Sequence, residues 1–296
     1  MEQKYQSLSL FDFQEQFSTT SQCLDYLVKL KWSNGYKCAK CSNKKWLKGT
    51  KAHDRQCSKC CYCESPTAGT LFHQLKFDLV KAFYIVFFVS TNKKGITSTE
   101  LSRKLALRQK TCWLFKRKVM KAMGGSGNFL LQGTVEVDET VVGGSEEGVR
   151  GRKNGKKKLV VIAIEKKKKG VSRFYAKVIE NAGALNLGKF MKETITPKAN
   201  IKTDEWAGYR PLIKHFKNLT QVKSGKKGRN FPELHRVIMN FKGWLRGMHH
   251  HVDDLQEYIN EYTYRFNRSF MKENIFENLV QRMVLANPCT YKMIIK

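Results

Sequence analysis

The stretch QGTVEVDETVVGG, residues 132–144, carries three acids within four positions of a valine-rich segment. Val135 and Val137 occupy alternate positions and therefore face one side of an extended strand. Glu136 and Asp138 face the other side. This alternation predicts a half-buried strand that presents two carboxylates on one face, just before a glycine turn.

The chain around this segment is long and strongly basic. It has 296 residues, of which 41% are hydrophobic, so it can build one large domain or two to three smaller ones around a sizeable core. Lys and Arg number 55 against 25 Asp and Glu, which gives a formal net charge of +30. An excess of this size favours a polyanionic partner, and nucleic acid is the one we expect, with a solvated lysine-rich surface as the alternative.

No export or membrane signal is evident in the sequence. The most apolar stretch, FYIVFFV at 83–89, is far shorter than the ~20 residues that span a bilayer. The first residues lack the basic start and long apolar run of a signal peptide. We therefore expect a cytoplasmic protein that makes no use of a membrane.

Six of the nine cysteines cluster near the beginning of the chain. Four of them form two C-x2-C pairs that are separated by fifteen residues. Two such turns can offer four thiolates to one tetrahedral zinc ion, and in a chain without an export signal this spacing favours metal binding over disulfides. The expected ligands of this structural Zn²⁺ are Cys38, Cys41, Cys57 and Cys60, with Cys61 and Cys63 as spectators.

A helical region follows the cysteines. Residues 77–91 are predicted to form an apolar helix, and residues 96–123 two shorter helices with a break near Ala106. The second of these is basic, which favours a helix-turn-helix that reads the major groove, with plain helical packing as the alternative. GGSGN at 124–128 is typical of a linker. The expected DNA contacts are Arg108, Lys110, Arg117 and Lys118.

Strand patterns then dominate from residue 133. After the acidic strand, segments 158–165 and 173–180 predict two further strands. A helix over 184–195 leads to a strand that ends at Asp204, and a strand over 219–223 leads to a helix opened by Pro232. This order predicts an α/β fold, the ribonuclease H-like mixed sheet with helices.

In a ribonuclease H-like sheet the first and fourth strands are neighbours, which would bring Asp138 beside Asp204. Two carboxylates at such close range repel each other unless a divalent cation lies between them. The sequence therefore favours a Mg²⁺ or Mn²⁺ site. The alternative makes Asp138 a turn residue and Asp204 a helix cap.

Six segments, in order from about residue 11 to about 285, resemble bacterial insertion-sequence transposases with an ISXO-type DDE domain, which are related to the eukaryotic Merlin elements. They are CLDYLVKLKWSNGYKCAKC, SPTAGTLFH, VEVDETVVGG, TDEWAGY, LHRVIMNFKGWLRGMHHHV and LQEYINEYTYRFNRS. The resemblance implies four parts: an N-terminal helix and zinc ribbon over 1–72, a helical DNA-binding segment over 73–127, a catalytic domain over 128–285 and a tail over 286–296.

The resemblance also implies catalytic residues. Asp138 in VDET and Asp204 in TDEW match the first two catalytic positions of the family. At the third position, where many relatives have glutamate, this chain has His235, and Lys242 follows seven residues later on the same helical face. An imidazole ligand suits Mn²⁺ better than Mg²⁺. Two other candidates for the third ligand lie on the same helix: Glu233 and Asn240.

Further basic and aromatic residues are candidates for contact with DNA. The stretches 150–158 and 223–229 would follow the phosphate backbone, through Arg152, Lys156, Lys226 and Arg229. The histidines in MHHH, 248–251, allow a second metal site but resemble a family segment for DNA contact or packing. Three aromatic residues either stack on bases or pack internally: Trp206, Tyr209 and Trp244.

The resemblance implies a transposase that binds terminal inverted repeats and target DNA, by a cut-and-paste or a replicative route. It also implies a homo-oligomer in the synaptic complex and a location at the nucleoid when DNA is bound. Two alternatives differ in chemistry: a transposase-derived DNA-binding regulator whose catalytic centre has decayed, and a stand-alone nuclease of the same fold. The third-position histidine keeps the regulator open, whereas the presence of both aspartates favours the enzyme.

Overall fold

The computed structural model divides the chain into two compact units. One comprises Met1–Met123 with Met271–Lys296, and the other comprises Gly124–Phe270. The structure describes residues 8–125, 129–143, 157–168, 170–248, 252, 254–269, 271 and 274–295. Within these residues, no helix has the length and apolar character needed to cross a membrane.

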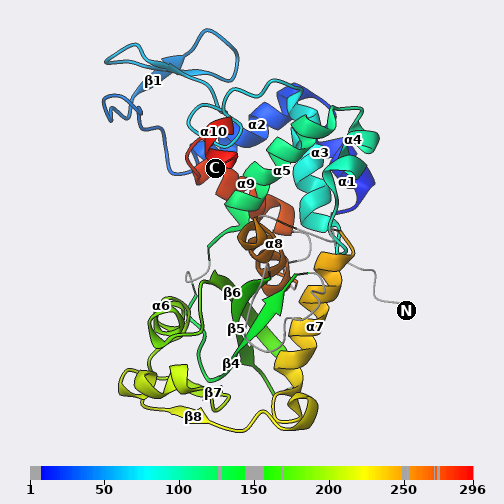
Figure 1. Ribbon diagram of the computed structural model, residues 1–296. Coiled ribbons are helices and arrows are strands. Elements are labelled where there is room, and N and C mark those ends of the chain that lie inside the picture. Colours follow the sequence, from blue (N-terminus) through cyan, green and yellow to red (C-terminus); the bar gives the residue numbers. More distant parts are fainter. Residues whose placement is uncertain are drawn as a thin grey trace, which may run out of the picture. The chain divides into compact units, whose positions relative to one another are not determined.

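A five-stranded mixed sheet organises the second unit (Figure 1). Its strand order is β6-β5-β4-β7-β8, with β4, β5 and β6 antiparallel and with β7 and β8 parallel to β4. This is the ribonuclease H-like arrangement, so the predicted fold class is confirmed. The strands are β4 (Thr134–Val142), β5 (Lys158–Lys166), β6 (Val171–Ile179), β7 (Asn200–Thr203) and β8 (Leu219–Gln221).

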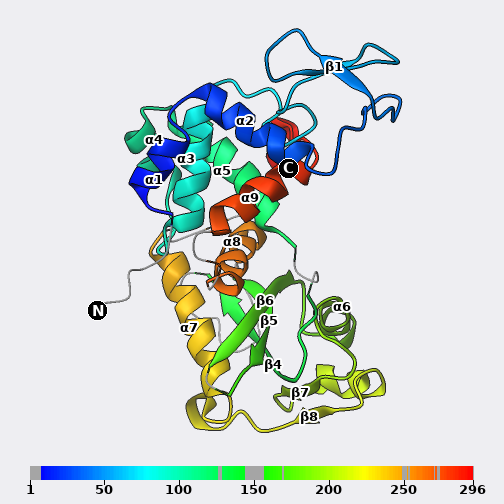
Figure 2. The ribbon, with the colours of Figure 1, turned by 180° about the vertical axis from the view of Figure 1, so that it is seen from behind.

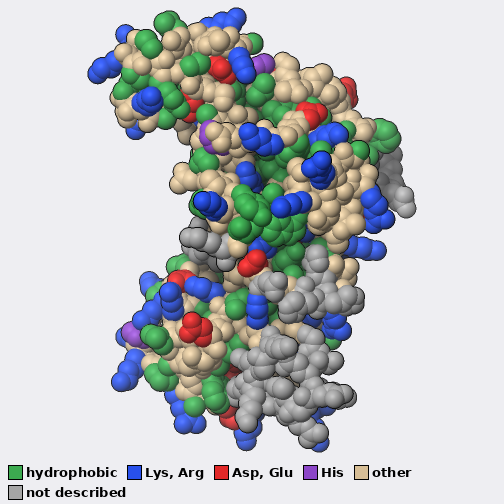
Figure 3. All heavy atoms as spheres, turned by 45° about the horizontal axis from the view of Figure 1, so that its top comes forward, with side chains coloured by type: hydrophobic (Ala, Val, Ile, Leu, Met, Phe, Trp, Pro, Cys, Tyr) green, Lys and Arg blue, Asp and Glu red, His purple; other side chains and the backbone are tan. Residues whose placement is uncertain are grey.

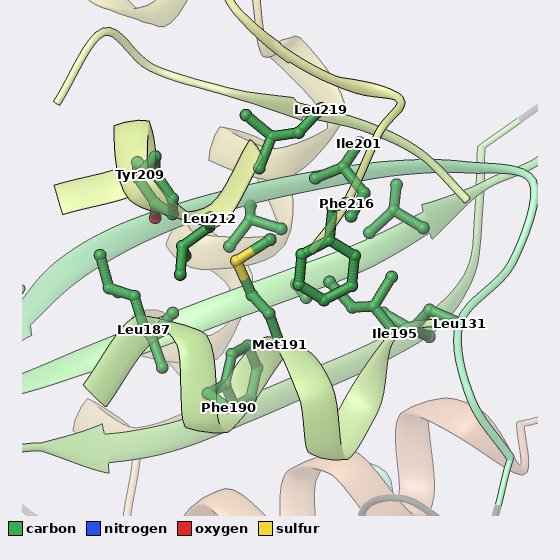
Figure 4. Close-up of a cluster of buried hydrophobic side chains, with 14 of the residues drawn as sticks. Leu131, Leu187, Phe190, Met191, Ile195, Ile201, Tyr209, Leu212, Phe216 and Leu219 are labelled. Carbon is green, nitrogen blue, oxygen red and sulfur yellow. The ribbon is translucent and has the colours of Figure 1, made fainter. Parts of the chain in front are cut away.

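One face of this sheet is covered by helix α6 (Ala184–Thr194) and the 3-10 helix η1 (Ala207–Lys214). Figure 4 shows their side chains closing over the strands. Val135 and Val137 of β4 lie fully buried in this cluster, on the face that the alternation predicts. Because the cluster draws on β4, β7 and both helices, it holds the two strands that carry the acids in a single register.

The opposite face is covered by α7 (Pro232–Arg246) and α8 (Leu255–Asn267). Phe174 of β6 packs against aromatic rings of both helices, among them Phe241 at 6.2 Å and Tyr262 at 5.4 Å between centroids. Asn267 of α8 also exchanges hydrogen bonds with the backbone of Phe174. These bonds occupy an edge strand that would otherwise expose unpaired backbone groups.

The first unit is helical apart from the cysteine module. Two helices lie where the helix-turn-helix pattern predicts them, and Ala106, at the end of the first, has a left-handed backbone with φ of 50°. The N-cap of that helix is Thr97, whose hydroxyl accepts a hydrogen bond from the Glu100 N–H. The helices are α1 (Leu10–Gln16), α2 (Thr20–Lys31), α3 (Leu79–Thr91), α4 (Ser98–Leu105), α5 (Gln109–Met123), α9 (Asn274–Leu285) and α10 (Tyr291–Ile294).

Helix α9 belongs to the first unit, which differs from the predicted catalytic segment 128–285. Both ribbon views place it beside α2, α3 and α5 (Figures 1 and 2). Phe276 of α9 enters an aromatic cluster with Phe13, Phe17 and Phe83, at centroid distances of 5.5 to 6.1 Å. The burial of this ring assigns the helix to the N-terminal unit, and no periodicity in the sequence marks that boundary.

The cysteine module is a small three-stranded antiparallel sheet of β1 (Trp46–Lys48), β2 (Arg55–Cys57) and β3 (Cys63–Glu64). Its apolar contacts are few, with Trp32 and Tyr36 the main buried rings. A largely buried ion pair joins it to α2, with Lys31 Nζ 2.7 Å from the Glu64 carboxylate. A module with so little core needs another source of folding energy.

The glycines of the second unit give a test of its packing. A Cβ on Gly208 would meet the carbonyl oxygen of Ala182 and lie 2.8 Å from Trp206 Nε1, which are hydrogen-bonded to each other. We therefore expect Gly208→Ala to lower the free energy of unfolding by about 1–3 kcal/mol. The matched control is Gly243→Ala, in open space within α7, which should raise it by up to about 1 kcal/mol. Urea denaturation measures both, and equal effects would contradict this packing.

Candidate active site and metal centres

The parallel pairing of β4 with β7 brings the two aspartates together. Val137 is the register partner of Thr203, so the next residue of each strand, Asp138 and Asp204, lies at the same sheet edge. Carboxylate oxygens of Asp138, Glu139 and Asp204 all lie within 4.8 Å of one another. Residues that are 66 positions apart in the sequence thus form one half-buried acidic group.

Local hydrogen bonds orient these aspartates. Asp138 Oδ1 accepts from the Glu139 N–H at 2.8 Å, and Asp204 Oδ1 accepts from the Trp206 N–H at 3.1 Å. The side-chain amide of Gln221 donates to the carbonyl oxygens of Asp204 and Trp206, at 3.1 and 2.9 Å. The turn after β7 is therefore fixed from β8 as well as from within, which holds the Asp204 side chain at the sheet edge.

Glu139 is a member of the acidic group that the sequence analysis did not select as a site residue. Strand alternation assigns it to the valine face, opposite Asp138. It nevertheless joins the group, at a point where β4 continues beyond its pairing with β7, which stops at Thr203. Its position immediately after Asp138 was the only available signal.

The donor set of this group suits a hard divalent cation. Three carboxylates within 4.8 Å of one another carry a concentration of negative charge that a cation would relieve. Carboxylate oxygens are the ligands that Mg²⁺ and Mn²⁺ prefer. The residues present thus fit the divalent metal that the sequence predicts at this place.

Helix α7 presents different groups on its two flanks. On one flank Glu233 lies 3.3 Å from Lys166 Nζ, which is also 2.9 Å from the buried carboxylate of Glu136. The hydrogen bond to Glu136 raises the pKa of Lys166 despite partial burial. Although burial opposes the shift, the helix backbone and Lys166 lower the pKa of Glu233. Glu233 therefore serves this ion-pair network, away from the acidic group.

The other flank of α7 carries His235 and Lys242, which lie seven residues apart. Burial lowers the pKa of Lys242, as do the neighbouring cations Arg246 and Lys157, while Asp138 acts in the opposite direction. Asp138 is thus close enough to Lys242 to act on its charge. Asn240, the remaining candidate for the third ligand, lies on the exposed side of the helix.

His235 itself packs against the backbone of Gly228, so closely that no Cβ could be accommodated there. Its Nε2 is buried and makes no hydrogen bond within the described part of the chain. His235 is not among the residues whose ligand atoms lie within 4.8 Å of one another. Its role as the third ligand stays a prediction.

The aromatic residues of this region are packed. Tyr209 is fully buried in the core of Figure 4, and Trp206 packs against the same core and donates its indole N–H to Ala182. Trp244 packs on Phe241 and Tyr262. Base stacking, the other alternative for these rings, would require them to leave these contacts.

The four predicted zinc ligands also come together. Sγ of Cys38 lies 3.6 Å from that of Cys60, and Sγ of Cys41 lies 3.5 Å from that of Cys57. Although burial opposes the shift, the Cys60 N–H and other nearby donors lower the pKa of Cys57 to about 6, which favours the thiolate that zinc requires. Four sulfur ligands in this arrangement fit tetrahedral Zn²⁺.

The predicted DNA contacts differ in their exposure. Arg108 and Lys110 are exposed, and Lys118 is half-buried. Arg117 is buried with its guanidinium over Trp113, so it contributes to helix packing and offers no exposed cation. Figure 3 shows Lys and Arg side chains spread over the visible faces of both units.

A second group of predicted DNA contacts flanks the acidic site in the sequence. Lys226 and Arg229 are exposed in the loop between β8 and α7. Arg152 and Lys156, together with the histidines 249–251, lie outside the described residues. Of these four predicted contacts, the structure therefore describes Lys226 and Arg229.

The cysteine geometry predicts one zinc ion per chain. Cys57→Ser should abolish stoichiometric zinc and unfold the ribbon, because the binding energy of such sites, about 10–16 kcal/mol, is their folding energy. Cys61→Ser is the matched control, since Cys61 is exposed and outside the group. Metal analysis and the charge-transfer absorption of the Co²⁺ form measure this. Loss of zinc from the Cys61 variant alone would contradict the assignment.

The Lys166 network predicts a pH-dependent stability. Lys166→Met leaves the buried Glu136 carboxylate without its cation, so we expect the free energy of unfolding to fall by about 2–3 kcal/mol. The effect is smaller than for a fully buried pair because Lys166 is 28% exposed. Because folding lowers the pKa of Glu233, its ion pair with Lys166 adds to the free energy of unfolding above the ordinary pKa of 4.5. This contribution is lost as the pH falls below that value. The difference from wild type should therefore shrink in acid.

The control for this network is Lys177→Met, which breaks the exposed pair with Glu193 and should cost about 0–1 kcal/mol. Chemical denaturation from pH 8 down to about pH 2.5, well below the ordinary pKa of Glu233, measures both variants. A Lys166→Met penalty that grew as pH fell would contradict the network.

Comparison with solved structures gives matches of low similarity. Solved structures with limited similarity include a pre-cleavage Mos1 transpososome (10% identity, 69% of this chain and 78% of that chain, TM-score 0.30) and the Mos1 strand transfer complex (11%, 70% and 78%, TM-score 0.31). TM-scores this low do not establish a shared fold. The fold assignment made here follows from the strand order of the sheet.

A search of curated protein sequences found no significant match. The family comparison is specific: residues 130–267 match the ISXO2-like transposase domain. This range contains the whole five-stranded sheet, the acidic group, α7 and α8. Residues 130–267 of this chain are therefore similar to the ISXO2-like transposase domain, a DDE transposase domain.

Proposed function

We propose that this chain is the transposase of an insertion sequence, which binds the terminal inverted repeats of its element and catalyses metal-dependent DNA cleavage and strand transfer. The observation that carries the proposal is the approach of Asp138 and Asp204 at the edge of the sheet. The family match over 130–267 supports the same reaction class. The substrate is DNA, and the reaction is phosphoryl transfer.

The acidic group would hold the catalytic ions. Asp138 and Asp204 would bind Mg²⁺ or Mn²⁺, with His235 as the proposed third ligand from α7. Divalent ions bound there would supply activation of the attacking oxygen and stabilisation of the leaving oxygen. The fixed turn after β7 holds Asp204 in place before substrate arrives, so little reorganisation is needed on binding.

The surrounding cations would position the DNA. Lys242, whose charge is influenced by Asp138, would contact a phosphate near the scissile bond. Lys226 and Arg229 in the exposed loop before α7 would follow the phosphate backbone, which orients DNA without reading its sequence. Their positive charge offsets the repulsion between the acidic group and the polyanion.

The helical unit would supply sequence recognition. The exposed Arg108 and Lys110, at the start of α5, support a role for α4 and α5 in reading the inverted repeats. We place the active form at the nucleoid in the cytoplasm, as a homo-oligomer that holds two element ends. The zinc ribbon would have a structural role.

A strand-transfer assay tests the proposal. Purified chain is incubated with Mn²⁺ and with DNA that carries the inverted repeats flanking its reading frame. We expect cleavage at the repeat ends and joining to a target plasmid. Asp138→Asn and Asp204→Asn should each remove both products, a loss on the order of 10³-fold or more for members of one catalytic unit.

Glu205→Gln is the matched control, because Glu205 follows Asp204 directly but is exposed and outside the acidic group. It should retain activity. Tight repeat binding with no cleavage by the wild-type chain would contradict the enzyme and indicate a regulator. Nicking without joining would contradict strand transfer and indicate a nuclease.

A further inference from the structure

Glu139 occupies an unusual place for a strand residue that alternates away from the catalytic face. Its carboxylate lies within 4.8 Å of ligand atoms of both Asp138 and Asp204. A third negative charge at this distance adds repulsion to a group that already holds two. The position therefore needs a physical reason beyond chain connectivity.

Tyr209 provides an independent observation at the same point. Its side chain is fully buried, and its hydroxyl meets no full hydrogen-bond geometry with any residue the structure describes. Burial raises the pKa of the phenol most, followed by Glu139, through its charge and a hydrogen bond, and then by Asp138 and Asp204. A buried hydroxyl requires a hydrogen-bond acceptor, and carboxylate oxygens can accept its hydrogen bond.

The backbone around Tyr209 is tightly held. Its N–H donates to the Trp206 carbonyl at 3.2 Å, and the Trp206 indole is bonded to Ala182. Tyr209 also packs within the cluster of α6 and the sheet shown in Figure 4. Its hydroxyl is thus a rigid donor beside the acidic group.

We propose that Glu139 is a further ligand of the divalent-cation site, and that Tyr209 is a positioning residue that orients the Glu139 carboxylate. The inference rests on the proposed function. It means that β4 and the turn after β7 supply three hard oxygen ligands by themselves. The site would then bind Mn²⁺ before DNA arrives, mainly through these oxygens.

Mn²⁺ binding to the full, zinc-loaded chain without DNA tests this inference. Electron paramagnetic resonance measures free and bound Mn²⁺, and zinc keeps the cysteine site because thiolates favour it. We expect Glu139→Gln to weaken binding on the order of 10-fold or more, and Tyr209→Phe by about 10-fold. The control Glu205→Gln, exposed and outside the acidic group, should bind as the wild type does.

A second measurement distinguishes a purely structural role of Tyr209 from a role in positioning Glu139. Tyr209→Phe keeps the buried ring and its packing, so the Tm of the metal-free chain should change little, while the Mn²⁺ affinity falls and the spectrum of bound Mn²⁺ changes. A lowered Tm with unchanged affinity would overturn the positioning role.

The outcomes also separate this inference from the proposed function. Wild-type Mn²⁺ affinity in Glu139→Gln, together with weak binding in Asp138→Asn, would overturn the role of Glu139 and leave the catalytic aspartates in place. Wild-type affinity in both variants would remove the metal site itself and overturn both proposals.

Discussion

The parallel hydrogen bonding between β4 and β7 is the constraint on which this structure depends. It places Asp138 beside Asp204 through the pairing of the residues before them, Val137 and Thr203. Both of those residues are fully buried, so the register is held by the core that lies beneath the acids. A slip of one residue would turn the aspartates into the core and the valines to the outside. Packing thus holds like charges together.

Helix α7 presents different charged groups on its two flanks near Asp138 and Asp204. Its buried stripe rests on the sheet, and the two flanks of that stripe meet different partners. Glu233 reaches the Lys166–Glu136 pair, whereas the charge of Lys242 is influenced by Asp138. Glu233 thereby forms an ion pair that stabilises the fold, and Lys242 remains near the acidic group. This division explains how an acid in the first turn of α7 can contribute to stability at a distance from the acidic group.

The chain separates two metal chemistries by ligand type. The ribbon offers four sulfur ligands, and the sheet offers carboxylate oxygens. Soft thiolates favour zinc and hard oxygens suit Mg²⁺ or Mn²⁺, so the two ligand sets fit different ions. The ribbon also has few apolar contacts of its own, which makes a structural ion the natural source of its stability.

Local pattern in the sequence determined much of this protein. The alternation in VEVDE, the two C-x2-C pairs and Pro232 each depend on residues within one element, and the structure has the corresponding strand, cysteine group and helix start. Tertiary structure alone decided which distant or off-pattern residues meet. Glu139 joins the acids, Arg117 is buried and α9 packs in the first unit. These outcomes depend on strand ends, register and packing between elements, which the periodicity of a single segment does not encode.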